Sequence, residues 1–179
     1  MDDELLITSG PALTNPDADS FRHVLGHYPT GVAVITAHTS TGPVGLSMNS
    51  FTSLSLQPPL VLFCPAQSSS TWPQLREVGA IAINVLSAGQ EAVSRQFAGP
   101  AGHRFDGVAW SAGQNEAPLL DDALGWIECA VQAEYPAGDH TVVIAEIQRM
   151  GVHAHLGDPL VFFRGAYYAG IAAAARAED

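Results

Sequence analysis

The architecture of this chain follows from residues 45–72, which read GLSMNSFTSLSLQPPLVLFCPAQSSSTW. Apolar and polar side chains alternate along residues 45–56. The apolar set is Leu46, Met48, Leu54 and Leu56, and the polar set is Ser47, Asn49, Ser53 and Ser55. Alternation with a period of two predicts one strand with one face in a core. The polar face carries hydroxyls and an amide instead of charges. It is therefore either a plain structural face or a face for a polar, planar, phosphorylated ligand.

Two more elements follow in the same stretch. Gln57-Pro58-Pro59 ends the strand because proline cannot donate to a β-ladder, and the apolar run at residues 60–64 predicts a buried strand. The hydroxyl-rich residues 68–71 predict the start of a short helix. Free N–H groups and hydroxyls at a helix start favour a phosphate, and a simple helix cap inside a polar loop is the alternative.

The N-terminal part predicts one helix and one strand. Residues 1–16 form a flexible arm in this interpretation, and Asp17 or Asp19 caps a helix at residues 20–26. A turn at residues 28–31 leads into a β-branched strand at residues 32–36. The loop at residues 39–43 then makes a hairpin with the strand described first.

The C-terminal part predicts two more helices and several strands. Ser70 or Thr71 caps a helix at residues 72–78, which Gly79 ends. Ser87 and Gln90 have the spacing of a capping box for a helix that runs to about residue 97. Strands are predicted at residues 80–86, 124–134, 140–150 and 160–163, with a short one at residues 107–110. The tail, residues 171–179, is expected to fray.

These elements amount to roughly seven strands and three short helices, without the regular strand–helix alternation of a parallel sheet. The prediction is one domain at residues 17–170 of the all-β to α+β class. We expect an antiparallel Greek-key split β-barrel with short capping helices.

Composition excludes several functions. The net charge of −11 argues against nucleic acid or an anionic membrane as a partner, because their phosphates would repel the chain. The sequence contains no lysine, so there is no Schiff-base lysine for pyridoxal phosphate and no phosphate-loop lysine. His153 and His155 lie beside Asp158, but nothing else completes a ligand set, and no metal site is predicted.

Compartment is predicted from the cysteines and the N-terminus. Cys64 and Cys129 are isolated from each other, as buried free thiols of a cytoplasmic protein would be. No apolar run approaches the ~20 residues that cross a bilayer. The acidic start, Met-Asp-Asp-Glu, has the wrong charge for a secretory signal. We expect a cytoplasmic protein with no membrane partner.

The order of several short motifs resembles the flavin reductase family of the FMN-binding split-barrel fold, the small reductase partners of two-component flavin-dependent monooxygenases. The resemblance runs from about residue 21 to residue 170. Its landmarks are Pro29-Thr30-Gly31-Val32, Gly45-x-Ser47-x-Asn49-Ser50-Phe51, Ser53-Leu54-Ser55-Leu56-x-Pro58-Pro59-Leu60, Asn84-Val85-Leu86, Gly138-Asp139-His140 and Phe163-Arg164-Gly165-x-Tyr167.

The resemblance implies a flavin site. The residues it assigns to FMN or FAD are Pro29, Thr30, Gly31, Ser47, Met48, Asn49, Ser50, Phe51 and Ser53, with Ser68, Ser69 and Ser70 at the phosphate and Arg104 as a further contact. Asn49 can both donate to and accept from an amide-like edge, and a turn or edge-strand amide is the alternative. Ser47 stands where the family commonly has threonine, and Arg104 where it commonly has lysine. Both changes keep the hydroxyl or the charge.

The resemblance also implies a nicotinamide site. Gly138-Asp139-His140 is similar to the family's trio beside the nicotinamide, so His140 is expected to orient NADH or NADPH, with Tyr167 as a second contributor. Stacking the two rings at reacting distance supplies the rate gain, because hydride transfer to flavin N5 needs no protein acid. A structural histidine and an aromatic side chain that closes the barrel are the alternatives.

The function expected from the resemblance is an NAD(P)H:flavin oxidoreductase, a homodimer with flavin in a cleft between subunits, that supplies reduced flavin to a monooxygenase. An absent arginine cluster leans towards NADH. Two alternatives remain open: a split barrel that holds FMN as a prosthetic group for oxidation or electron transfer, and a non-enzymatic flavin-binding module. Pyridoxamine phosphate oxidase shares the general barrel, but the lack of lysine argues against it.

Overall fold

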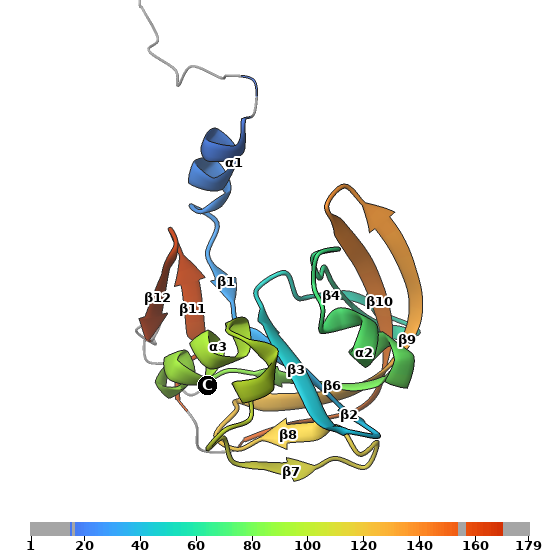
Figure 1. The fold of residues 1–179 in the computed structure, drawn as a ribbon. Helices are drawn as coiled ribbons and strands as arrows, with labels where there is room; N and C mark the ends of the chain where they lie inside the picture. Colours follow the sequence, from blue (N-terminus) through green and yellow to red (C-terminus); the bar gives the residue numbers. More distant parts are fainter. Residues whose placement is uncertain (1–14, 16, 154–156, 170–179) are drawn as a thin grey trace, which may run out of the picture.

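The structure is a computed structural model, and it describes residue 15, residues 17–153 and residues 157–169 (Figure 1). Except for Asn15, the predicted arm and tail lie outside the described residues. Within the described part of the chain, no helix is long and apolar enough to span a membrane.

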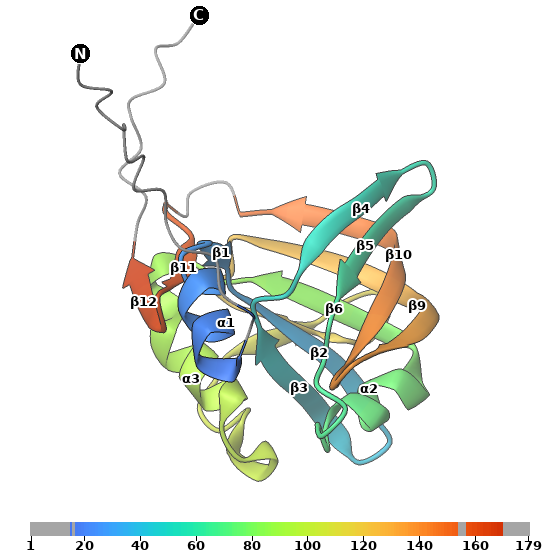
Figure 2. The same ribbon diagram turned by 90° about the horizontal axis from the view of Figure 1, so that it is seen from above.

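A seven-stranded antiparallel sheet forms the body of the molecule. Its strands, in spatial order, are β3 (Gly42–Met48), β2 (Ala33–Thr39), β6 (Ala80–Val85), β9 (Gly125–Ala137), β10 (His140–Val152), β5 (Pro59–Phe63) and β4 (Thr52–Leu56). Every pairing is antiparallel, which confirms the predicted class. The edge strands β3 and β4 do not pair with each other, so the sheet curves into a barrel that stays open on that side (Figures 1 and 2).

Two small sheets complete the β structure. One contains β1 (Thr30–Gly31), β11 (Leu160–Phe163) and β12 (Ala166–Ala169), and the other contains β7 (Trp110–Ala112) and β8 (Pro118–Leu120). The short strand predicted at residues 107–110 begins only at Trp110. Strands β8 and β12 were not predicted, because segments of three or four residues carry little periodic signal.

The helices begin and end where local signals predict. They are α1 (Ala18–Leu25), α2 (Trp72–Val78) and α3 (Glu91–Ala98), with 3₁₀ turns η1 (Ala88–Gln90) and η2 (Ala101–His103). Asp17 caps α1, Gly79 ends α2 in the left-handed conformation, and Ser87 and Gln90 form the predicted capping box. The predicted cap of α2 is wrong in detail: the Ser69 hydroxyl accepts the Trp72 N–H at 3.1 Å, while neither the Ser70 nor the Thr71 side chain caps the helix.

The prediction of one strand at residues 45–56 is wrong. The chain breaks at residues 49–51, so that β3 and β4 lie at opposite edges of the sheet. Leu46 is buried as expected, but Leu54 is 45% exposed and Leu56 is 91% exposed. Among the described strands, β4 pairs with β5 alone, in a hairpin that extends away from the body (Figure 2). Period-two alternation does not distinguish such an edge from a core strand.

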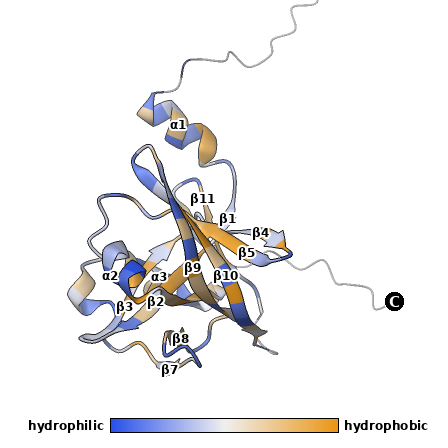
Figure 3. Ribbon diagram, turned by 90° about the vertical axis from the view of Figure 1, so that its right-hand side faces the viewer, coloured by the Kyte–Doolittle hydropathy of each residue, from blue (hydrophilic) through white to orange (hydrophobic). Residues whose placement is uncertain are grey.

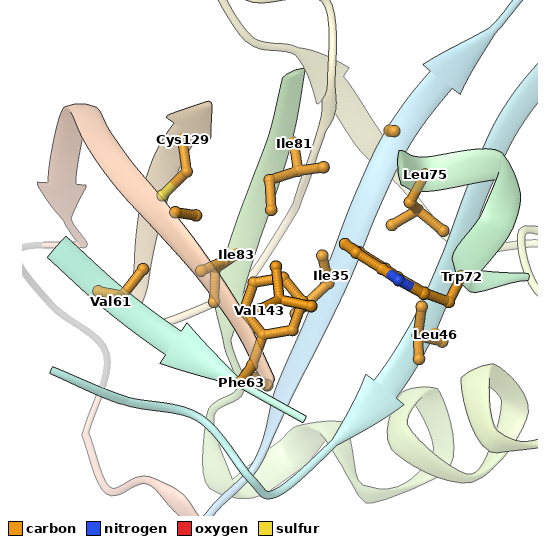
Figure 4. Packing of buried hydrophobic residues seen from close by; sticks show 13 residues of the cluster. Ile35, Leu46, Val61, Phe63, Trp72, Leu75, Ile81, Ile83, Cys129 and Val143 are labelled. Carbon is orange, nitrogen blue, oxygen red and sulfur yellow. The ribbon is translucent and has the colours of Figure 1, made fainter. Parts of the chain in front are cut away.

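Two hydrophobic clusters pack on opposite faces of β2. The first lies between the main sheet and α2, where the rings of Phe63 and Trp72 meet edge-on at 5.4 Å (Figure 4). Ile35 points into this cluster, whereas its neighbour Val34 packs into the second. The second cluster includes Phe97 of α3 and Leu160 of β11, so it holds the small three-stranded sheet against the main one.

Helix α1 contributes nothing to either cluster. None of its residues is buried, and its apolar residues are exposed: Phe21 by 58%, Val24 by 63% and Leu25 by 53%. Figure 3 shows the helix standing clear of the main sheet, with hydrophobic and hydrophilic positions interspersed. The predicted helix therefore exists, but its apolar face has no partner among the described residues.

Candidate functional site

A largely apolar hollow of about 580 Å³ lies between α1, β1, the β3–β4 loop and β11. Its apolar walls come from Phe21, Leu25, Tyr28 and Phe162. Three predicted site residues supply polar groups to it, namely Thr30, Asn49 and Ser50. A concave apolar surface with a few polar groups is the usual form of a small-molecule site.

Thr30 is the most informative of these residues. Its hydroxyl oxygen is buried, yet it has no hydrogen-bond partner among the described residues. A buried polar atom without a partner is costly, so it commonly marks a place that a ligand or water fills. A flavin fits this hollow on that ground, because its ring needs an apolar bed with hydrogen bonds along one polar edge.

The two residues of the β3–β4 loop play different parts. The Ser50 hydroxyl is committed to the fold, since it accepts the Cys64 N–H at 3.0 Å and donates to the Cys64 carbonyl at 3.2 Å. These bonds fasten the loop to the end of β5. Asn49 is exposed at the rim and keeps its amide for a ligand. An amide can both donate to and accept from a polar ring edge.

A chain of hydroxyls joins two other predicted residues. Ser47 Oγ lies 2.9 Å from Ser94 Oγ, which lies 2.9 Å from Tyr167 Oη. Ser94 is fully buried in α3, and the Arg95 guanidinium lies 4.8 Å from the centre of the Tyr167 ring. The sequence analysis missed Ser94. A polar residue on the buried face of an amphipathic helix was the available signal.

The predicted phosphate loop lies at the start of α2. The Ser69 hydroxyl accepts the N–H groups of Thr71 and Trp72 at 3.3 and 3.1 Å, so it serves the helix. Ser68 and Ser70 are exposed, and their hydroxyls remain available to a ligand.

Arg104 ties this region together. It donates to the carbonyl oxygens of Gly99 and Gly45 and to the Thr71 hydroxyl, through four hydrogen bonds of 2.6–3.0 Å. Partial burial lowers the pKa of its guanidinium below its usual range. Because a guanidinium has five N–H donors, one remains for a ligand. Arg104 is thus mainly a structural bridge.

His140 lies beside the phosphate loop. It opens β10 after the left-handed Gly138, forms a β-bridge with Ala66 and accepts a hydrogen bond from Gln67 at its carbonyl oxygen. Its Nδ1 lies 2.7 Å from Asp139 Oδ1. This hydrogen bond and the nearby imidazole lower the pKa of the Asp139 carboxyl below its usual 3.8. The imidazole is therefore held by one nitrogen and offers the other to a ligand.

The remaining predicted residues are spread around these features. Pro29 and Gly31 are exposed next to Thr30, Met48 and Phe51 pack partly against the first core cluster, and Ser53 is exposed on β4. The set therefore falls into three groups: the hollow, the hydroxyl chain and the loop beside His140. The single chain does not bring His140 into the lining of the hollow.

The chain is similar to known flavin reductases over most of its length. A family model described as "Flavin reductase like domain" matches residues 25–170. The FMN reductase (NADH) SmoA of Agrobacterium fabrum is 45% identical over 149 residues, 83% of each chain. The monooxygenase reductase subunit HsaB of Mycobacterium tuberculosis is 38% identical over 152 residues, 84% of this chain and 81% of that protein.

A solved structure agrees with the fold. The NADH:FAD oxidoreductase SgcE6 of Streptomyces globisporus, in complex with NAD and FAD fragments, superposes with a TM-score of 0.84 at 36% identity. The superposition covers 91% of this chain and 99% of that one.

Proposed function

The chain belongs to the flavin reductase-like family, and from that premise we propose that it is an NAD(P)H:flavin oxidoreductase serving a separate flavin-dependent monooxygenase. The flavin, FMN or FAD, accepts a hydride from the reduced nicotinamide and then leaves. The observation that carries this proposal is the apolar hollow with the unpartnered Thr30 hydroxyl at its wall.

The hollow is the proposed ring site. Tyr28 and Phe162 give an apolar bed on which a planar ring can lie, and burying the ring there excludes water from it. Thr30 and Asn49 hydrogen-bond the polar edge. Ser68, Ser70 and the remaining Arg104 N–H are proposed to hold the flavin phosphate.

His140 is the proposed nicotinamide-positioning residue. In the tautomer whose Nδ1–H donates to Asp139, the His140 imidazole has a lone pair on Nε2 that can accept the N–H of a carboxamide. Tyr167 is proposed to contact the same ligand, with its hydroxyl held by Ser94. These residues bind and orient, and no protein acid is required.

We also propose that the chain works as a homodimer with the flavin in a cleft between subunits. The exposed Phe21, Val24 and Leu25 on α1 and the 91% exposed Leu56 on β4 support this, because such side chains commonly lie in interfaces. Leu25→Glu should lower the dimer affinity measured by analytical ultracentrifugation. A monomer at working concentration with full reductase activity would contradict the dimer.

Thr30→Val tests the ring site, with Thr30→Ser as the control that keeps the hydroxyl. Removing a buried hydroxyl without a partner should leave the stability unchanged or raise it. The loss of one ligand hydrogen bond should weaken flavin binding about two- to tenfold. Flavin-dependent NADH oxidation should show a matching rise in the flavin KM. If wild type and Thr30→Val have equal flavin KM values, the flavin ring does not bind in the hollow.

A further inference from the structure

A second pocket, of about 560 Å³, adjoins the hollow and is basic. Arg22, His23 and His27 of the α1 region line it together with Arg164, from the turn between β11 and β12. It shares Arg22, Gly26 and Gly165 with the hollow. Among the described residues, none that line the pocket is acidic, although the chain as a whole carries a net charge of −11.

The fold brings these cations together from distant parts of the sequence. The Arg164 N–H donates to the Gly26 carbonyl at 2.8 Å, which fastens the β11–β12 turn to the end of α1. A Cβ on Gly26 would lie only 2.8 Å from Arg22 O, so glycine suits this end of α1, while its 3.6 Å distance to Arg164 Cα would be an ordinary contact. His27 Nδ1 lies 2.7 Å from the His23 carbonyl oxygen, which holds the imidazole at the pocket.

Arg164 occupies a position that disfavours arginine. It has φ +49° and precedes Gly165 with φ +76°, in a two-residue hairpin turn where asparagine–glycine is preferred. Its guanidinium packs over the Phe163 ring at 5.2 Å, and no carboxylate of the described residues pairs with it. The fold therefore gains little from arginine here, while the pocket gains a cation.

Arg22 also keeps its donors available. Its ion pair with Asp19 is 3.6 Å long, and both side chains are largely exposed, so the pair is weak and easily exchanged for a ligand. Two guanidiniums beside imidazoles form a multidentate site for the oxygens of a phosphate. The adjoining hollow suits a planar ring, and a ring followed by a phosphate is the outline of a nucleotide.

We propose that this basic pocket binds a phosphate group of a bound nucleotide, in addition to the phosphate proposed at Ser68 and Ser70. The proposal rests on the proposed function, and it names a subsite for the flavin or for the nicotinamide dinucleotide. The absence of an arginine cluster in the sequence favoured NADH over NADPH. That argument no longer holds, because the fold brings Arg22 and Arg164 together.

The test is ligand titration of the double variant Arg22→Gln/Arg164→Asn. Asparagine suits the left-handed turn, so the variant should keep its fold, and its thermal midpoint checks this. Arg76→Gln is the control, because Arg76 is an exposed arginine on α2 outside both pockets. Riboflavin, FMN, FAD, NAD⁺ and NADP⁺ are titrated at one fixed ionic strength.

We expect a phosphate-bearing ligand to bind about ten- to hundredfold more weakly to the double variant, while riboflavin binds as to the control. Weaker FMN binding assigns the pocket to the flavin phosphate, and loss of FAD affinity alone assigns it to the adenylate part of FAD. Loss of NAD⁺ affinity assigns it to the nicotinamide dinucleotide. A larger loss for NADP⁺ than for NAD⁺ assigns it to the additional phosphate.

The proposal is overturned if all four phosphate-bearing ligands bind the double variant within about twofold of the control, or if none of them binds the wild type. These titrations involve no turnover. If the wild type binds the ligands through the pocket but does not oxidise NADH, the reductase function is contradicted while the phosphate subsite is supported.

Discussion

Ser94 is the residue on which the arrangement of Ser47 and Tyr167 depends. Its hydroxyl lies within hydrogen-bond distance of both, and it is fully buried. Ser94→Ala should destabilise the protein by about 1–3 kcal/mol, because two polar groups lose a partner. Tyr167→Phe removes the other end of the chain. In denaturant unfolding, the double variant should be less destabilised than the sum of the two single variants; strict additivity would mean that the hydroxyls do not interact.

The contact between Asp139 and His140 has a defined pH range. Because the native pKa of Asp139 is lowered from 3.8, the contact contributes stability above pH 3.8 and loses it as the pH falls through the lowered native value. The same hydrogen bond fixes the orientation of the His140 imidazole, which we propose binds the nicotinamide. Asp139→Ala should therefore raise the KM for NADH at neutral pH with little change in kcat.

Asp106→Ala is the control for Asp139→Ala, because Asp106 Oδ2 lies 2.8 Å from His103 Nδ1 in another exposed Asp–His pair, outside the proposed nicotinamide site. This control should leave the KM for NADH unchanged. An equal KM for Asp139→Ala and Asp106→Ala would mean that Asp139 does not orient His140.

Among the elements, β8 is tied to the main sheet by two buried polar side chains, Thr36, whose hydroxyl donates to the Pro118 carbonyl at 2.6 Å, and Asn84. Asn84 of β6 donates to Val34 O at 3.1 Å and accepts the Leu120 N–H at 2.7 Å. It thereby joins β6 to β2 and β8 inside the protein. Asn84→Ala should lower the free energy of unfolding by about 2–3 kcal/mol in urea, whereas Gln132→Ala at the surface should change it little. A loss below about 1 kcal/mol would show that water replaces the amide.

What could be predicted at this scale depended on whether the signal was local. Asp17, Gly79 and the Ser87–Gln90 capping box act within one helical turn, so the helix ends were predicted to within a turn, although Ser69 and not Ser70 or Thr71 caps α2. The break at residues 49–51, which separates β3 from β4, depends on which strands these two segments pair with. That information lies in distant segments, so alternation alone wrongly placed Leu54 and Leu56 in the core.

The site was predicted unevenly for the same reason. The family motifs indicated Thr30 and Asn49, which the structure brings to one hollow. The local sign of Ser94 was its place on the buried face of α3, but its partners come from distant elements. No local pattern marked the meeting of Arg22 with Arg164, which also lie far apart in the sequence.

For the whole molecule, the net charge of −11 opposes the approach of anionic nucleotides. Binding must then come from short-range contacts, which salt screens weakly when they are partly buried. We expect the FMN dissociation constant to change by less than about tenfold between low and high salt, as measured by flavin fluorescence. A steep increase with salt would show that long-range attraction dominates instead.

The measurement to make first is anaerobic mixing of the purified protein with several equivalents of FMN and excess NADH, while the absorption of oxidised flavin is followed. A diffusible-flavin reductase bleaches all the FMN over many turnovers, and His140→Ala slows this mainly by raising the KM for NADH. Bleaching that stops at one flavin per chain would identify a prosthetic group. No bleaching with FMN or FAD, and with NADH or NADPH, would contradict the reductase function.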